Sequence, residues 1–214
     1  MMVKQERAAR TRRSLIRAAA EIFAAEGFVP ASLTMISRRA GVSNGALHFH
    51  FTSKEALAGA VEEEAAREVR LITESQSCDE APVLQLLVDA THTLMHRLGE
   101  DVVVQAGFEL SGDISRPGGV DLRRQWRCWV EGILQRAASD GGLADGVAPD
   151  HAADALLAAT VGFEVLGARD GKEWLSRPAL TRFWELMLPG LAARPDSLVT
   201  RGSPGAARPR ASEV

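Results

Sequence analysis

The stretch from Ser32 to Phe51, SLTMISRRAGVSNGALHFHF, constrains the fold most, because it reads as two short helices joined by a tight turn. Ser32 is suited to cap a helix that Gly41 ends, and Ser43 is suited to cap the next helix. Because few large apolar side chains lie in this stretch, the two helices cannot form a core of their own. They have to pack on neighbouring helices to be stable. The pattern therefore predicts two short helices that pack on a larger helical body.

The second helix of this pair has a surface suited to close contact with a polyanion. It begins with Asn44, and the next two residues are small, so its N-terminal N–H groups can approach a phosphate. Leu47 and Phe51 can anchor the helix to a core, while Asn44 and His48 share another face. This is the layout of a helix-turn-helix, whose second helix enters the major groove of DNA. The alternative is an αα-corner with no ligand.

The distribution of charge along the chain favours a DNA-binding helix-turn-helix over an αα-corner with no ligand. Residues 1–54 contain nine Lys or Arg and three Glu, which gives +6. Because the whole chain carries −3, residues 55–214 carry −9. A basic head on an acidic body indicates a polyanionic partner at one end of the chain.

The rest of the chain also follows helical periodicity. The first helix ends at Gly27, a fourth begins after the cap Ser53, and further helices are expected at roughly 82–98, 101–111, 121–139, 150–168 and 177–193. No useful alternating strand pattern is present, so the fold class is all-α. We expect a helix-turn-helix domain at 1–52 and a helical ligand-binding and dimerisation domain at 53–193. Residues 194–214 are rich in Pro, Gly, Ser and Arg, which predicts a disordered tail.

Several classes of function are disfavoured by what the chain contains. No apolar run reaches membrane-spanning length and no signal peptide is visible, so we expect a cytoplasmic protein with no membrane partner. Cys78 and Cys128 lie too far apart for a zinc motif. His92 and His96 have i,i+4 spacing, with Asp89 one turn earlier, but lining of a surface or pocket is the commoner role of such a pair. With no phosphate loop or nucleophile motif, we expect no catalysis, cofactor or metal.

The segment LTMISRRAGVSNGALHFHFTSKEAL resembles the signature of the TetR family of transcriptional repressors, and the resemblance covers roughly the first 60 residues. In that family the motif includes a Tyr where this chain has His48, so a hydrogen bond to phosphate here would come from an imidazole. The resemblance implies that Thr34 and Lys54 contact phosphates and that residues 43–48 form the recognition element. The DNA-contacting residues are then Thr34, Ser43, Asn44, Gly45, Ala46, His48 and Lys54.

A narrower resemblance, to the γ-butyrolactone receptor branch of that family, rests on segments such as VVVQAGFELS and ATVGFEVLG. It implies a repressor of antibiotic biosynthesis that a small-molecule effector releases from its operator. Aromatic residues with a few polar groups suit such a pocket, although a plain core is the commoner meaning of this pattern. Receptors of the branch often have Gln where this chain has Ala65, which suggests a pseudo-receptor with another ligand, such as an antibiotic. The expected pocket residues are Gln105, Phe108, Trp126, Trp129 and Thr160.

The last two long helices are apolar on more than one side, so they need packing partners on more than one side. The family resemblance implies that they pair with their copies in a four-helix homodimer interface, which matches a palindromic double-stranded operator. The alternative is that they complete the core of a monomer. Among regulators, the competing function is a TetR-type repressor of a drug efflux pump, which an acidic pocket residue such as Glu109 or Glu164 would favour.

Overall fold

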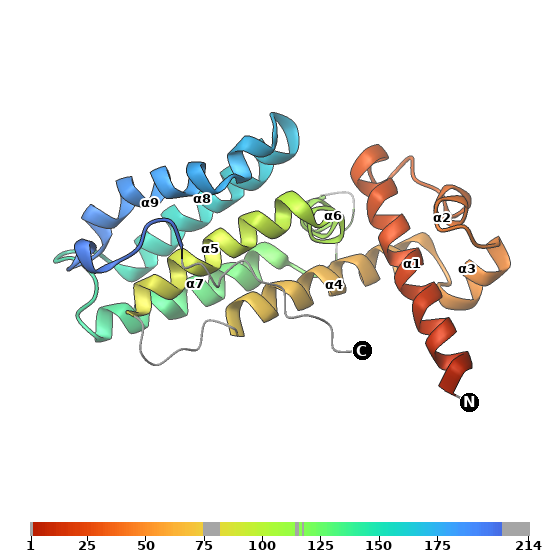
Figure 1. Cartoon of the computed structure of the whole chain (residues 1–214), viewed down its shortest axis with the longest axis horizontal. Coiled ribbons are helices and arrows are strands. Elements are labelled where there is room, and N and C mark those ends of the chain that lie inside the picture. Colours follow the sequence, from red (N-terminus) through yellow and green to blue (C-terminus); the bar gives the residue numbers. More distant parts are fainter. Residues whose placement is uncertain (1, 75–81, 114–115, 117, 203–214) are drawn as a thin grey trace. The chain divides into compact units, whose positions relative to one another are not determined.

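The computed structural model describes residues 2–74, 82–113, 116 and 118–202, and most of them lie in helices (Figure 1). Within these ranges the only β-type pairing is an isolated bridge between Leu143 and Ala192. The all-α class is therefore confirmed, and the expected helix limits after residue 80 agree with the observed ones to within two residues. Packing divides the chain into two compact units, which are described separately.

Unit 1 contains the N-terminal helices and one helix from the middle of the chain. Its helices are α1 (Met2–Glu26), α2 (Leu33–Arg39), α3 (Asn44–His50), most of α4 (Lys54–Glu74) and α6 (Val102–Ser111). Gly27 ends α1 with φ of 81°, and its N–H donates to the Phe23 carbonyl at 2.8 Å. Ser32 and Ser43 cap α2 and α3, because each side chain accepts a hydrogen bond from the backbone N–H three residues later.

A single apolar core holds unit 1 together. α1, α2 and α3 contribute buried side chains that include Leu15, Phe23, Ile36 and Leu47, while α6 adds Val103, Ala106 and Leu110. Full burial of one such large apolar side chain stabilises a fold by about 1.5–3 kcal/mol. The segment 1–52, which we propose as the DNA-binding domain, thus lies inside a larger packed unit that also includes residues 53–68 and 101–122.

Unit 2 contains the remaining helices. They are α5 (Val83–Glu100), most of α7 (Leu122–Ser139), α8 (Pro149–Arg169), the 3-10 helix η1 (Lys172–Leu175), α9 (Arg177–Leu191) and the 3-10 helix η2 (Pro195–Ser197). Trp126 on α7 and Trp184 on α9 are the largest fully buried side chains of this unit. α5 is buried on most of its circumference, so it forms the central helix of unit 2.

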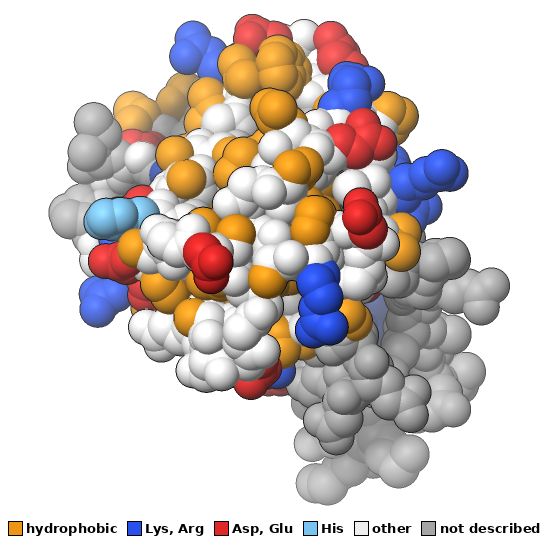
Figure 2. Space-filling model, turned by 90° about the vertical axis from the view of Figure 1, so that its left-hand side faces the viewer, with side chains coloured by type: hydrophobic (Ala, Val, Ile, Leu, Met, Phe, Trp, Pro, Cys, Tyr) orange, Lys and Arg blue, Asp and Glu red, His pale blue; other side chains and the backbone are white. Residues whose placement is uncertain are grey.

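The solvent-exposed part of the α8 surface carries several apolar residues. Its buried residues form a single stripe that includes Leu156, Thr160 and Glu164, whereas Ala155, Ala158 and Val165 are exposed on other sides. Leu186 on α9 is 79% exposed. Figure 2 shows hydrophobic side chains spread between scattered charged ones on one face of the molecule. By length and composition α8 is long and apolar enough to cross a membrane, but the core helix of a soluble protein passes the same test.

The C-terminal segment departs from the expected disordered tail at 194–214. Residues 194–202 are placed, with η2 at Pro195–Ser197, and the following residues bind α5 and α9. Gln85 donates to the Val199 carbonyl at 3.2 Å and accepts from the Val199 N–H at 2.7 Å. Composition alone gave no sign of the Gln85 partner, which lies 114 residues away along the chain. The last twelve residues of the chain lie outside the described residues.

Candidate DNA-binding and effector sites

Helix α3 turns one face to the core of unit 1 and the other to solvent. Leu47 is fully buried and Phe51 is 5% exposed, and their i,i+4 spacing places both on the inner face. We call α3 the recognition helix. Of the residues expected to contact DNA around it, Thr34, Ser43, Asn44, Gly45 and His48 are exposed and Ala46 is half-buried. The structure thus brings these six residues together around the N-terminus of one helix.

The side chain of Asn44 is fixed by a buried hydroxyl on α2. Ser37 is 3% exposed, and its Oγ donates to Asn44 Oδ1 at 2.5 Å. The same Oγ lies 3.1 Å from the Thr34 carbonyl oxygen. Because the Asn44 carbonyl oxygen is used inside the protein, its NH₂ group is the part left to face outward as a donor. An amide NH₂ can donate to base-edge acceptors or phosphate oxygens.

Phe49 is a surface residue that the sequence reasoning missed. It is 80% exposed on the recognition helix, and its ring meets the His50 ring edge-on with centroids 5.2 Å apart. An exposed aromatic side chain at this place suits apolar contact with a thymine methyl group. The signal was present in the sequence, because the inward positions of Leu47 and Phe51 force the residues between them outward.

Lys54 has hydrogen-bond partners inside the protein that the sequence did not predict. Its ammonium group donates to the carbonyl oxygens of Phe28, Val29 and Ala31 at 2.8–3.0 Å, and it lies 4.4 Å from the centroid of the Phe28 ring. An ammonium group has three N–H donors, so these carbonyls use all of them. A phosphate would therefore have to compete with these carbonyls for the ammonium group, and the expected phosphate contact by Lys54 stays a prediction. In this structure Lys54 fixes the segment that leads into α2.

A buried ion pair lies behind the same segment. Arg116 donates to both carboxylate oxygens of Glu62 on α4, at 2.7 and 3.4 Å, and the two side chains are 9% and 1% exposed. The Arg116 guanidinium also lies 4.7 Å from the centroid of the Phe28 ring. Phe28 is therefore contacted by two cations, Lys54 and Arg116, at distances typical of cation–π interactions. The loop before α2 is thus attached to α4 and to the segment before α7.

The basic head is exposed but partly neutralised. The arginines of α1 and α2 are exposed at positions 7, 10, 12, 13, 17, 38 and 39. Glu21 lies 2.5 Å from Arg39 and 3.5 Å from Arg17, so these two share one carboxylate. Exposed guanidinium groups beside the recognition helix suit contact with a phosphate backbone.

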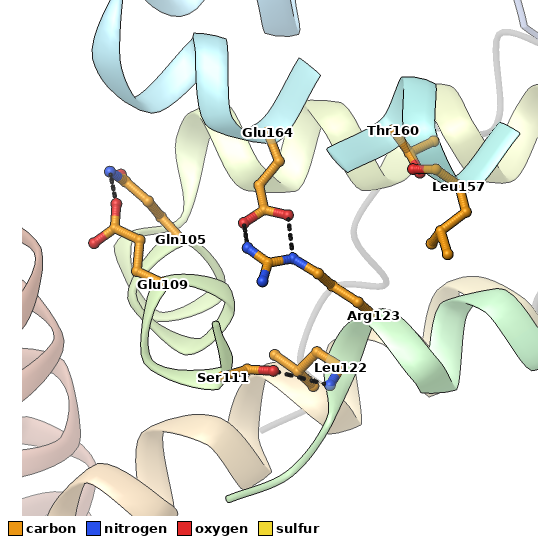
Figure 3. A network of polar contacts seen from close by, with 8 residues as sticks. All are labelled: Gln105, Glu109, Ser111, Leu122, Arg123, Leu157, Thr160 and Glu164. Atoms are coloured by element: carbon orange, nitrogen blue, oxygen red, sulfur yellow. Dashed lines mark hydrogen bonds and ion pairs between the residues drawn. The ribbon is translucent and has the colours of Figure 1, made fainter. Parts of the chain in front are cut away.

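The expected effector-binding residues are divided between the two units. In unit 2, Trp126 is 2% exposed and stacks on Trp129 with ring centroids 5.1 Å apart. The Trp126 Nε1–H is buried and has no acceptor among the described residues. Thr160 is also buried, and its hydroxyl donates to the Leu157 carbonyl of its own helix at 3.0 Å (Figure 3). The indole N–H is thus the polar group of this set best suited to bind a ligand acceptor.

The unit 1 members of the set lie on α6. Phe108 is 3% exposed, and Gln105 donates to Glu109 at 3.1 Å (Figure 3). In unit 2, Glu164 accepts from two nitrogens of Arg123, at 2.7 and 3.2 Å. The Glu164 carboxylate is therefore already paired with a cation. In the ranges that the structure covers, no cluster of three or more metal-binding side chains occurs, and Cys128 is an exposed thiol. Cys78 lies outside the described residues.

Comparison with known proteins agrees with this architecture. Residues 15–61, which contain the helix-turn-helix, match the model of the tetR family of bacterial regulatory proteins. The chain is 31% identical to the A-factor receptor protein of Streptomyces griseus over 194 residues, which is 89% of this chain and 67% of that protein. The chain belongs to the TetR family.

Solved structures of TetR-family proteins match both units of the chain. A γ-butyrolactone receptor described as ArpA-like has a TM-score of 0.77 and 26% identity, over 92% of this chain and 95% of that one. CprB of Streptomyces coelicolor, solved in complex with its biological operator sequence, has a TM-score of 0.77 and 27% identity, over 92% and 96%. This TetR-family chain is thus a DNA-binding transcription regulator similar to γ-butyrolactone receptors.

Proposed function

We propose that this protein is a homodimeric repressor of antibiotic biosynthesis that acts in the cytoplasm, binds a palindromic operator, and is released by a small lipophilic effector. The effector belongs to the γ-butyrolactone-like molecules or to the antibiotics themselves. The protein acts by binding and needs no catalytic group. The observation that carries the effector part of the proposal is the buried indole N–H of Trp126, which finds no acceptor in the described part of the chain. It favours a ligand that is mostly apolar and has a carbonyl-type acceptor.

The surroundings of Ala65 support a pseudo-receptor rather than a receptor of the common type. Ala65 is fully buried, and a Cβ atom placed on Gly107 would lie only 2.3 Å from the Ala65 Cβ. The two helices α4 and α6 therefore meet closely at this pair. A Gln at position 65 would need space that this contact fills, so the hydrogen bond it makes in other receptors has no counterpart here. We therefore expect the effector of this protein to place its polar groups differently from the ligands of receptors that have Gln at this position.

The efflux-pump alternative is disfavoured by the pairing of Glu164. Repressors that sense cationic drugs need a carboxylate that can face the ligand. Here Arg123 donates to both Glu164 oxygens, and the Glu164 side chain is 9% exposed. A second cation would have to compete with a guanidinium group that is already in place. The pairing of Glu164 therefore favours a neutral effector over a cationic one.

The exposed apolar side of α8 and α9 supports the dimer. Ala155, Ala158 and Val165 on α8 and Leu186 on α9 are exposed in the single chain. Small residues let two helices approach closely, and a two-fold axis brings the same surface of each copy together. A dimer would present two recognition helices to two half-sites about 34 Å apart, or a multiple of that distance.

The proposal is tested by sequencing the genomic DNA that the purified protein retains and then measuring release from that DNA. The probes are a γ-butyrolactone with an apolar side chain and the antibiotic whose genes adjoin the retained DNA. Trp126→Phe keeps an aromatic ring but removes the indole N–H together with the five-membered ring, and it should weaken effector binding about three- to tenfold, with operator affinity unchanged. Trp184→Phe is the control, because the Trp184 indole is also buried without an acceptor among the described residues. Equal effects of both variants would make Trp126 an ordinary core residue.

A further inference from the structure

A cavity lies in unit 2 and shares no residue with the expected effector set. It has a volume of about 410 Å³ and lies where the C-terminal half of α5 meets η1 and the first turn of α9. Figure 1 shows α5 and α9 in the same bundle, with α8 leading toward α9. Ligand sites for small molecules usually have about 300–1,000 Å³, so this cavity is large enough for a small organic molecule.

Basic side chains dominate the polar lining of this cavity. His92 and His96 lie one turn apart on α5, Lys172 comes from η1, and Arg177 begins α9. Thr93 and Ser176 add hydroxyl groups, and Glu100 is the one carboxylate among the lining residues. At neutral pH the lining therefore has a net positive charge from Lys172 and Arg177 against Glu100. Such a surface attracts an anion, and Lys and Arg supply charge-assisted hydrogen bonds.

Hydrogen bonds and side-chain packing hold the residues that line the cavity in place. Lys172 donates a hydrogen bond to the Gly99 carbonyl at the end of α5. Leu175 packs where a side chain on Gly167 would otherwise lie, since a Cβ atom there would be 2.5 Å from Leu175 Cγ. Ser176 caps α9, a helix of 15 residues, by accepting from the Ala179 N–H. The positive end of this helix adds to the field of the basic side chains.

Two residues that line the cavity also bind the C-terminal segment. His92 Nε2 donates to the Thr200 carbonyl at 2.9 Å, and Arg177 donates to the carbonyls of Arg201 and Gly202 at 2.8 and 3.0 Å. His92 and Arg177 thus belong to the cavity lining and to the anchor of residues 200–202. A ligand that moves either side chain would shift this segment as well.

We propose that this cavity binds a small organic carboxylate, independently of the effector site at Trp126. Leu175 provides an apolar wall for the hydrocarbon part, while Lys172 and Arg177 hold the carboxylate. Binding is linked to the placement of residues 199–202 through His92 and Arg177. The protein would then respond to two ligands of different chemistry, one neutral and one anionic.

The test uses 1-naphthoate as the probe and neutral 1-naphthalenemethanol as its control in NMR titrations of the full chain. We expect 1-naphthoate to shift the imidazole signals of His92 and His96 and the amide signals of Val199 and Gly202 in a saturable manner. The alcohol should leave them unchanged. Absence of a saturable shift, or the same shifts with both compounds, overturns the proposal.

Variants identify the site. Lys172→Gln should weaken 1-naphthoate binding about tenfold, because a charge-assisted contact is lost. Arg182→Gln makes the same change of charge on an exposed residue of α9 outside the cavity and should have no effect. Trp126→Phe should also leave 1-naphthoate binding unchanged, which separates this site from the effector site. Equal binding by the Lys172 and Arg182 variants, or loss of binding in the Trp126 variant, contradicts the proposal.

Discussion

Ser37 Oγ lies 2.5 Å from Asn44 Oδ1, so a buried hydroxyl of α2 holds the first residue of the recognition helix. The helix-turn-helix is therefore fixed by a side-chain contact as well as by its apolar core. This contact determines which end of the Asn44 amide faces outward. It connects a residue that cannot touch DNA to one that we expect to read it.

Asn44→Ala should cost roughly 1–3 kcal/mol in binding to the operator and much less with random DNA, if Asn44 contacts a base. Ser37→Ala should give a smaller loss of the same kind, about 1 kcal/mol, because it frees the amide to rotate. Fluorescence anisotropy with operator and shuffled duplexes at one salt concentration measures both. If either variant weakens the two duplexes equally, Asn44 has no role in sequence recognition.

Lys54→Met should destabilise the fold rather than alter electrostatic DNA binding. The change removes three hydrogen bonds to the carbonyls of residues 28, 29 and 31, and we expect the free energy of unfolding to fall by about 1–3 kcal/mol. Chemical denaturation measures this loss. The dependence of log affinity on log salt should keep its slope, whereas Arg38→Gln, a change at an exposed residue of α2, should lower it by about one. If Lys54→Met lowers this slope instead, Lys54 contacts a phosphate of the DNA.

Removing one partner of the Glu62–Arg116 pair should lower the free energy of unfolding strongly, whereas replacing both partners by apolar residues should lower it much less. Glu62→Gln leaves a buried guanidinium without its carboxylate, so the free energy of unfolding should fall by about 3–5 kcal/mol. The double variant Glu62→Met with Arg116→Met should recover much of this loss, because the desolvation of both charges is avoided. Urea denaturation of Glu62→Met, Arg116→Met and the double variant gives the coupling energy. Additive losses would show that the pair contributes no direct interaction.

His92 should make stability depend on pH. Burial is the largest influence on its imidazole and lowers its pKa, against the opposing effect of the hydrogen bond to Thr200. Since the unfolded chain then binds the proton more readily, stability from neutral His92 is present above about pH 6.5 and is lost as the pH falls. His92→Gln should flatten the fall in unfolding free energy between pH 7 and 5. His96→Gln serves as the control, and an unchanged pH profile in the His92 variant contradicts this assignment.

Most of the fold could be predicted because its signals are local. Ser32, Ser43 and Gly27 mark helix ends through their own caps and dihedral angles, and apolar spacing gave the long helices. The true partners of Lys54 and Glu62 could not be predicted in this way. Lys54 bonds residues 23 to 26 positions earlier, and Arg116 lies 54 positions from Glu62. Family resemblance placed Lys54 on DNA, but the geometry of the loop before α2 determines what its three donors bind.

The proposed effector site shows that sequence patterns do not predict contacts between helices. Its aromatic members could be named from the sequence. The lack of an acceptor for Trp126 Nε1 among the described residues and the pairing of Glu164 with Arg123 could not, because they depend on how the helices pack. Likewise, a Pro- and Arg-rich composition predicted disorder from residue 194. The carbonyls of residues 199–202 nevertheless find donors on Gln85, His92 and Arg177.

The central claim is that two copies of this chain bind a palindromic operator through α3 and that a ligand at Trp126 ends this binding. The most direct test is sedimentation of the protein together with the retained operator. The experiment is run without ligand, with an acyl γ-butyrolactone, and with the antibiotic whose genes adjoin the retained DNA. We predict a complex with an even number of chains that weakens steeply with salt and dissociates on addition of one of these ligands. The Trp126→Ala variant should bind the operator equally well and stay bound when the ligand is added. A monomer on DNA, or release of the variant at the same ligand concentration, would contradict the account.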